Sequence, residues 1–148
     1  MRSVVLLATL LLIPLSFCRA GDSRHPVTLR TIATADSAEV HPESVFEVTL
    51  TLENVGDTVQ QIKIPEAGWD RVWRSSNRHV TWDYWDCGAD NDVTIEIPPH
   101  RSYVFPKPLK MFVEGSVRQS HITFRMGFKT AAFGKTLWSV PVALEVIP

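Results

Sequence analysis

The residues from Phe46 to Glu53 alternate strictly between apolar and polar side chains, and this alternation constrains the fold more than any other feature of the sequence. The apolar positions are Phe46, Val48, Leu50 and Leu52. The positions between them are Glu and β-branched Thr, as expected for the solvent-facing side of a strand. The pattern therefore predicts a β-strand with one buried face, which must pack against a second apolar surface.

The same alternation recurs along the chain, separated by turn-forming Gly, Pro, Asn and Asp residues. The further strands are predicted within residues 27–33, 60–64, 72–74, 79–85, 93–97, 103–105, 122–128 and 138–146. Proline at 106 and 108 predicts that the piece following them lies at a sheet edge or outside the ladder. Pro141 predicts an edge or a bulge in the last strand in the same way. About seven short strands without helical periodicity predict an all-β fold, an Ig-like antiparallel β-sandwich.

Residues 1–20 have the features of a secretory signal peptide. Arg2 precedes an apolar run, and Cys18-Arg19-Ala20 offers small residues at the −3 and −1 positions of a cleavage site. The apolar stretch from Val4 to Phe17 is 14 residues long, whereas a membrane-spanning helix needs about 20. The alternative is a lipoprotein anchored through Cys18, but the bulky Phe17 makes that less favoured. We expect a secreted or periplasmic protein with one domain at residues 21–148.

The mature chain is mildly acidic and carries a single cysteine. Removing Arg2 and Arg19 from the 15 basic residues leaves 13 against 16 acidic ones, a net charge of −3. This balance and the lack of a basic run exclude a nucleic-acid-binding class. Cys87 is the only cysteine outside the leader, so no intramolecular disulfide is expected. Its aromatic neighbours favour burial, and we expect a monomer whose thiol is labelled slowly.

Four of the five tryptophans lie between residues 69 and 87. A sandwich core commonly accommodates one or two tryptophans, and we expect Trp82 and Trp138 to have that role. The remaining aromatic residues exceed what a small core requires, and Trp and Tyr are enriched at binding surfaces. The predicted ligand-contact residues are Trp69, Trp73, Tyr84 and Trp85.

Two turns resemble those of bacterial Ig-like modules. The segment from His41 to Asp57 is similar to the opening hairpin of such domains, and Ile97 to Tyr103 is similar to their recurring Leu-x-Pro-Gly-Glu-Ser turn, with His100 in place of the usual glycine. The intracellular-proteinase-inhibitor family and the cell-adhesion-related domain of bacteria share this layout. The resemblance implies an Ig-like fold and, for the inhibitor family, a protein-binding role. No reactive-site loop matches, so no residue role is carried over.

Metal and catalytic sites have little support in the sequence. The residue types that copper uses are present as His79, His100, His121, Cys87, Met111 and Met126, but no cysteine precedes the last His and Met in their loop, and Met126 falls on the predicted core face. The spacing of Asp83, Asp86, Asp90 and Asp92 matches no calcium loop. The sequence has no Gly-x-Ser-x-Gly motif. We therefore expect no cofactor and no enzymatic activity.

The function expected from the sequence is an exported, non-catalytic module that recognises a protein partner through an aromatic-rich surface. The alternative is a carbohydrate-binding module that uses tryptophans as stacking platforms, with a polysaccharide as partner. A periplasmic metal carrier is a third and weaker hypothesis.

Overall fold

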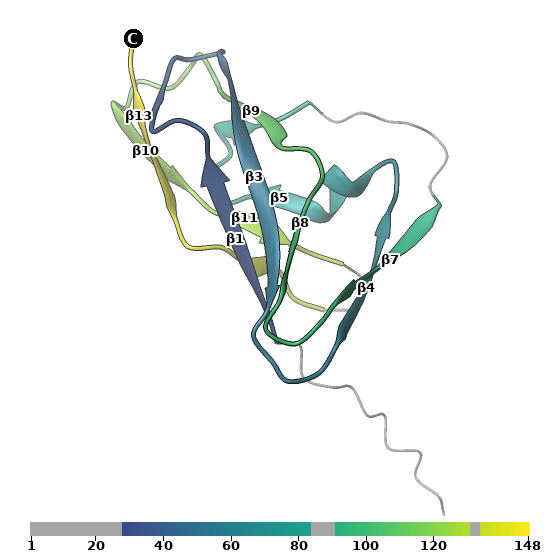
Figure 1. Ribbon diagram of the computed structural model, residues 1–148. Helices are drawn as coiled ribbons and strands as arrows, with labels where there is room; N and C mark the ends of the chain where they lie inside the picture. The colour runs from purple at the N-terminus through teal and green to yellow at the C-terminus, as the bar shows by residue number, and fades with distance from the viewer. Residues whose placement is uncertain (1–27, 84–90, 131–133) are drawn as a thin grey trace, which may run out of the picture.

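The structure is a computed structural model, and it describes residues 28–83, 91–130 and 134–148. These residues form a β-sandwich in which two layers of mainly antiparallel strands face each other, with a further pair of strands to one side (Figure 1). The predicted all-β sandwich is thus confirmed. The strands are more numerous than the sequence pattern suggested, because two predicted strands are divided and two further strands, β2 (Glu39–Val40) and β9 (Leu109–Val113), are added.

The first sheet is built around the strand that shows the strict alternation. This strand, β3 (Val45–Asn54), pairs antiparallel with β1 (Leu29–Ala35) on one side. On its other side it pairs with β9 (Leu109–Val113) and, further along, with β8 (Ser102–Val104). A short strand, β6 (Val80–Thr81), pairs with the free side of β9.

The second layer contains two three-stranded groups. Both groups take strands from the last third of the chain, and each adds one strand from earlier in the sequence. The first group is β10 (His121–Phe124), β13 (Val142–Val146) and β2 (Glu39–Val40), and the second is β12 (Leu137–Trp138), β11 (Met126–Phe128) and β5 (Trp73–Ser75). The pairing of β2 with β13 is parallel. The sequence analysis missed β2, because its two residues lie in a polar connection.

The remaining strands, β4 (Gln60–Pro65) and β7 (Asp92–Ile97), form an antiparallel pair beside the two layers (Figure 1). The 3₁₀ helix η1 (Trp69–Val72) follows β4 and leads directly into β5. The inward side chains of this pair, including Ile62 and Ile97, are buried in the same apolar core as the rest of the fold.

The apolar faces of the two layers meet in a continuous core. Leu50 of β3 is fully buried while Thr49 is exposed, which confirms the predicted faces of this strand. The rings of Phe46 in β3 and Phe124 in β10 contact each other across the layers, with centroids 6.3 Å apart. Met126 is also fully buried, as predicted.

The structure corrects the reading of the last two predicted strands. The first is divided at Arg125, and the second is divided between Trp138 and Val142. At this second break, Ser139 is buried, whereas Trp138 at the end of β12 and Val140 have exposed fractions of 44% and 69%. The prediction that Trp138 belongs to the core is therefore wrong.

The segment after Pro106 and Pro108 also differs from its prediction. It forms β9, which lies between β3 and β6 and not at an edge of the sheet. The ladder with β3 begins at Leu109, the residue after Pro108. Because both prolines precede the first paired position, no ladder hydrogen bond is lost, and the expected restriction does not apply.

Candidate functional site

Trp69 is the predicted ligand-contact residue that the structure places near the surface. It is the first residue of η1, and its side chain is partly buried against the core. Its ring lies 5.1 Å from that of Phe105, measured between centroids, with an interplanar angle of 33°. Phe105 is itself buried, so it holds the indole of Trp69 in a fixed position with part of its surface left accessible.

Trp73 has a different environment from the one predicted. Its exposed fraction is 0%, and its ring lies 5.1 Å from Phe128 and 5.2 Å from Phe105 between centroids. Its strand β5 pairs with β11 and turns the indole toward the interior. A ligand on the protein surface does not reach a fully buried indole, so we no longer include Trp73 among the contact residues.

The other aromatic predictions divide into two groups. Trp82 is buried, with an exposed fraction of 4%, as predicted. Tyr84, Trp85 and Cys87 lie outside the described residues, so their predicted roles and the burial of the thiol stay predictions.

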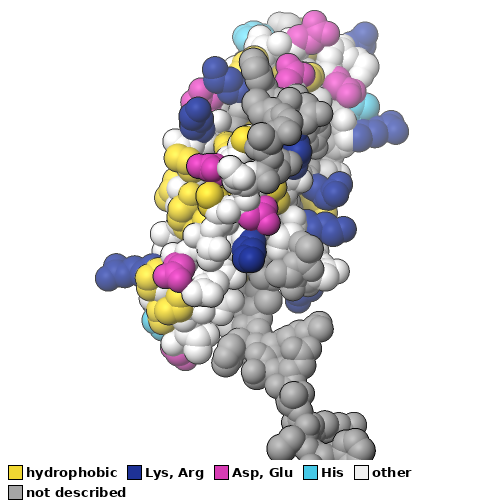
Figure 2. All heavy atoms as spheres, turned by 90° about the vertical axis from the view of Figure 1, so that its right-hand side faces the viewer, with side chains coloured by type: hydrophobic (Ala, Val, Ile, Leu, Met, Phe, Trp, Pro, Cys, Tyr) yellow, Lys and Arg dark blue, Asp and Glu magenta, His cyan; other side chains and the backbone are white. Residues whose placement is uncertain are grey.

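An open groove of about 600 Å³ lies beside Trp69, and we call it the Trp69 groove. Its lining comes from the start of β3, from β9 with the residues before it, and from the connection that carries η1. The lining residues are Val45, Glu47, Ala67, Trp69, Asp70, Asp83, Lys107, Pro108, Leu109, Lys110 and Phe112. This face of the molecule carries hydrophobic side chains with acidic and basic ones around them (Figure 2).

The β3–β9 register explains how one wall of the groove forms. Val45 is opposite Phe112, and Glu47 is opposite Lys110. These four side chains lie on the outer face of the pair, because the residues between them are buried. Side chains directly opposite each other in an antiparallel pair are close neighbours, so the wall consists of an apolar pair followed by a pair of opposite charges.

Sequence reasoning identified Trp69 but missed the apolar partners of the groove. Val45 begins β3 on its polar side and has an exposed fraction of 62%. Phe112 lies between the buried residues Met111 and Val113. Three consecutive apolar residues in a strand require one of them to point outward, and this is the signal that would have found Phe112.

Two of the histidines that the sequence analysis considered for copper are engaged in separate contacts. Nδ1 of His79 lies 2.9 Å from Oε2 of Glu114, and Nε2 of His100 lies 2.9 Å from Oδ1 of Asp57. Met111, like Met126, is fully buried in the core. No group of three or more His, Cys, Asp or Glu residues suited to a metal occurs within the part of the chain that the structure describes. Asp86 and Asp90 lie outside that part.

Comparisons with known proteins give no family assignment. No protein-family model matches the chain, and no curated protein matches it. Among solved structures, it is similar to a crystal structure of a FixG-related protein from Vibrio parahaemolyticus, with 12% sequence identity and a TM-score of 0.49. That match covers 82% of this chain and 98% of the other. Among the described residues, no helix is long and apolar enough to cross a membrane.

Proposed function

We propose that this chain is an exported, non-catalytic binding module that recognises a protein partner through the Trp69 groove. The observation that carries the proposal is the position of Trp69, which is fixed against Phe105 beside the outward pair Val45 and Phe112. Export is proposed from the signal-peptide pattern of residues 1–20. The lack of a recognisable nucleophile motif in the sequence supports a non-catalytic role.

The composition of the groove favours a protein as the occupant. Its apolar residues, including Trp69, Val45 and Phe112, are accompanied by acidic and basic side chains. Protein interfaces have this arrangement, with aromatic and aliphatic anchors surrounded by a polar rim. Because Phe105 already restricts the indole of Trp69, a partner that contacts it loses little additional side-chain entropy.

The occupant that we propose is an extended segment of the partner chain. The groove runs beside a two-stranded surface, and its volume of about 600 Å³ lies within the range of specific ligand sites. Both signs of charge line it, with Lys107 and Lys110 alongside Glu47, Asp70 and Asp83. We therefore expect a segment with apolar anchors and mixed charge, whose binding depends only weakly on salt.

The carbohydrate alternative through the tryptophan-rich stretch has less support. A stacking platform requires exposed indole faces, but Trp73 and Trp82 are both buried. A metal carrier also lacks a supporting observation in the described residues. We therefore propose neither a polysaccharide platform built from these two indoles nor a metal carrier as the function of the chain.

The test uses the full chain in its own host with a photo-crosslinking amino acid in place of Val45. We expect one discrete adduct with a partner protein, which mass spectrometry identifies. The purified partner should then bind the wild-type chain, and Val45→Asp should weaken the Kd by about tenfold or more, because it places a charge in the apolar part of the groove.

The matched control is Val140, which is also exposed, at 69%, and does not line the groove. The crosslinker at Val140 should give no such adduct, and Val140→Asp should leave the Kd unchanged. The same adduct from both positions, or an affinity that Val45→Asp does not alter, would contradict the proposal.

A further inference from the structure

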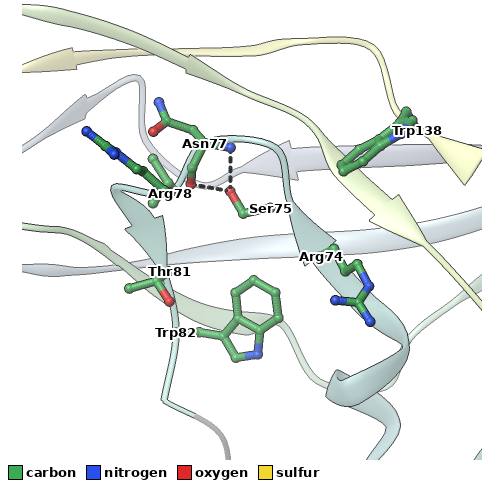
Figure 3. A pocket seen from close by; sticks show the side chains of 8 residues that line it. Arg74, Ser75, Asn77, Arg78, Thr81, Trp82 and Trp138 are labelled. Carbon is green, nitrogen blue, oxygen red and sulfur yellow. Dashed lines mark hydrogen bonds between the residues drawn. The ribbon is translucent and has the colours of Figure 1, made fainter. Parts of the chain in front are cut away.

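A second concave site lies between β5 and β12 of the second layer and β6 of the first, and we call it the Arg74 pocket. It has a volume of about 240 Å³. Its lining residues are Arg74, Ser75, Asn77, Arg78, Val80, Thr81, Trp82 and Trp138. None of them lines the Trp69 groove, so the two sites are separate. Trp82 and Trp138 lie on opposite sides of the pocket, with Arg74 between them at one end (Figure 3).

One wall of the pocket is a row of residues across three neighbouring strands. Gly127 of β11 is opposite Arg74 of β5 on one side and opposite Trp138 of β12 on the other. Paired residues in adjacent strands point to the same face of a sheet. Arg74 and Trp138 therefore project from the same face, separated by a residue without a side chain.

Gly127 also determines where the indole of Trp138 lies. A Cβ atom at position 127 would be 2.7 Å from two ring carbons of Trp138 and 2.5 Å from Cγ2 of Thr136. The indole thus packs against the Gly127 backbone while the side chain keeps an exposed fraction of 44%. This contact presents an aromatic surface to the pocket in a defined orientation.

The opposite wall is held by hydrogen bonds within the connection between β5 and β6. Oγ of Ser75 donates to the backbone oxygen of Asn77 at 2.9 Å, and Nδ2 of Asn77 donates to the backbone oxygen of Thr123 at 3.1 Å. Nε of Arg78 donates to Nε2 of His79 at 3.1 Å. In Figure 3 the guanidinium of Arg78 points away from the two tryptophans, so it adds positive charge at the margin.

The charged side chains that line the pocket are all positive. Its described lining contains two guanidinium groups and no carboxylate. Arg74 is exposed and makes no ion pair or side-chain hydrogen bond with another residue of the described ranges. A planar guanidinium with its donors available is suited to bind a carboxylate through two parallel hydrogen bonds.

From this arrangement we propose that the Arg74 pocket binds a carboxylate-bearing sugar unit. Arg74 would hold the carboxylate, the indole of Trp138 would contact the sugar ring, and Thr81 would offer a hydroxyl to the ring hydroxyl groups. The volume of about 240 Å³ is below the roughly 300–1,000 Å³ typical of sites for drug-sized ligands, which limits the bound unit to a small one. A bare anion would make no use of the oriented indole.

The test is an NMR titration of the ¹⁵N-labelled chain with D-glucuronate, D-glucose, acetate and inorganic phosphate, each added alone. We expect glucuronate to shift the indole N–H signal of Trp138 saturably, with a Kd on the order of 1 mM. The other three compounds should bind at least about tenfold more weakly than glucuronate, since each lacks the sugar ring, the carboxylate or both. If glucose bound as tightly as glucuronate, the carboxylate would not contribute to binding and the proposed role of Arg74 would be wrong. If acetate or phosphate bound as tightly as glucuronate, the pocket would be a site for simple anions and not for a sugar.

Variants then assign the contacts. Arg74→Gln should weaken glucuronate binding by about tenfold or more, because it removes the charge-assisted hydrogen bonds. Trp138→Ala removes the indole signal, so binding to this variant is followed on the backbone N–H signal of Arg74. This substitution should weaken binding of the same sugar by several-fold, since the side chain is exposed and the fold remains. Arg101→Gln removes an exposed arginine of a turn that does not line the pocket and should have no effect. The proposal is wrong if glucuronate fails to shift the signal or if Arg74→Gln binds it as the wild type does.

Discussion

At the scale of single residues, Asn54 shows how a buried polar side chain joins separate parts of the fold. It is fully buried, and its Nδ2 donates to the backbone oxygens of Thr58 and Ile97 at 2.7 and 2.9 Å. Its Oδ1 accepts from the backbone N–H of Gly56 and from Oγ1 of Thr28, both at 3.0 Å. The amide thus uses both donors and its acceptor, and it links β3 to the segment before β1 and to the end of β7.

We expect Asn54→Asp to lower the free energy of unfolding by about 3 kcal/mol or more, because a buried carboxylate replaces the two donors. Urea denaturation at neutral pH measures this change. The control is Asn91→Asp at an exposed position, which should change stability by less than about 0.5 kcal/mol. Similar midpoints for the two variants would show that the Asn54 network contributes little.

Two turns place residues other than glycine at positive φ. Glu43 has φ 63° and His100 has φ 55°, and each follows a proline in a turn closed by a hydrogen bond between its first and fourth residues. Proline in the second position and positive φ in the third is the pattern of a type II turn, which favours glycine there. His100 is also the position where the similar turn of bacterial Ig-like modules has glycine.

We expect His100→Gly to raise the free energy of unfolding by up to about 1 kcal/mol, because relief of the left-handed conformation outweighs the added flexibility of the unfolded chain. His100→Val should lower it by about 1–2 kcal/mol, since a β-branched residue is poorly tolerated at positive φ. The contact of His100 with Asp57 is well exposed and adds little. Thermal unfolding of the three proteins measures the order, and a glycine variant below wild type would contradict this account.

At the scale of elements, β3 supports the clearest prediction. Leu50 is fully buried between the layers, and Thr49 faces solvent. We expect Leu50→Asp to lower the free energy of unfolding by more than about 4 kcal/mol, because it buries an unpaired charge. Thr49→Asp should change it by less than about 1 kcal/mol. Circular dichroism during thermal unfolding measures both, and equal stability of the two variants would mean that the faces are assigned wrongly.

The sequence predicts elements well where one strand keeps one set of partners. The alternation in β3, β4 and β7 places the buried residues correctly, because period two holds as long as a strand stays in register. The alternation predicts the wrong buried residues where the chain passes from one partner strand to another. Ser139 is buried because its Oγ accepts a hydrogen bond from the backbone N–H of Met126 at 3.0 Å, and this contact shifts the inward face by one residue.

The candidate sites were predictable only in part, for a related reason. Trp69 was identified from aromatic composition, but Val45 and Phe112 become its neighbours only through the register of β3 and β9. Trp138 is expected in the core because a sandwich commonly buries one or two tryptophans, whereas its exposure and orientation depend on Gly127 in the adjacent strand. Residue types indicate what chemistry is available, and strand pairing decides which residues share a surface.

At the scale of the whole molecule, the question is whether the β4–β7 pair unfolds with the two layers. Ile62 and Ile97 of this pair are almost fully buried, and they belong to the same continuous core as Leu50 and Phe124. A shared core joins the pair energetically to the rest of the sandwich. We therefore expect the chain to unfold in a single cooperative transition.

The corresponding variant is Ile62→Ala, which should lower the free energy of unfolding of the entire domain by about 2–5 kcal/mol, since it leaves a cavity in the common core. Circular dichroism and tryptophan fluorescence should report the same shifted midpoint, because every element unfolds together. Val59→Ala, at a position with an exposed fraction of 53% next to the same strand, should leave the midpoint nearly unchanged. Two separate transitions, with only one of them shifted by Ile62→Ala, would show that the pair is an independent unit attached to the sandwich.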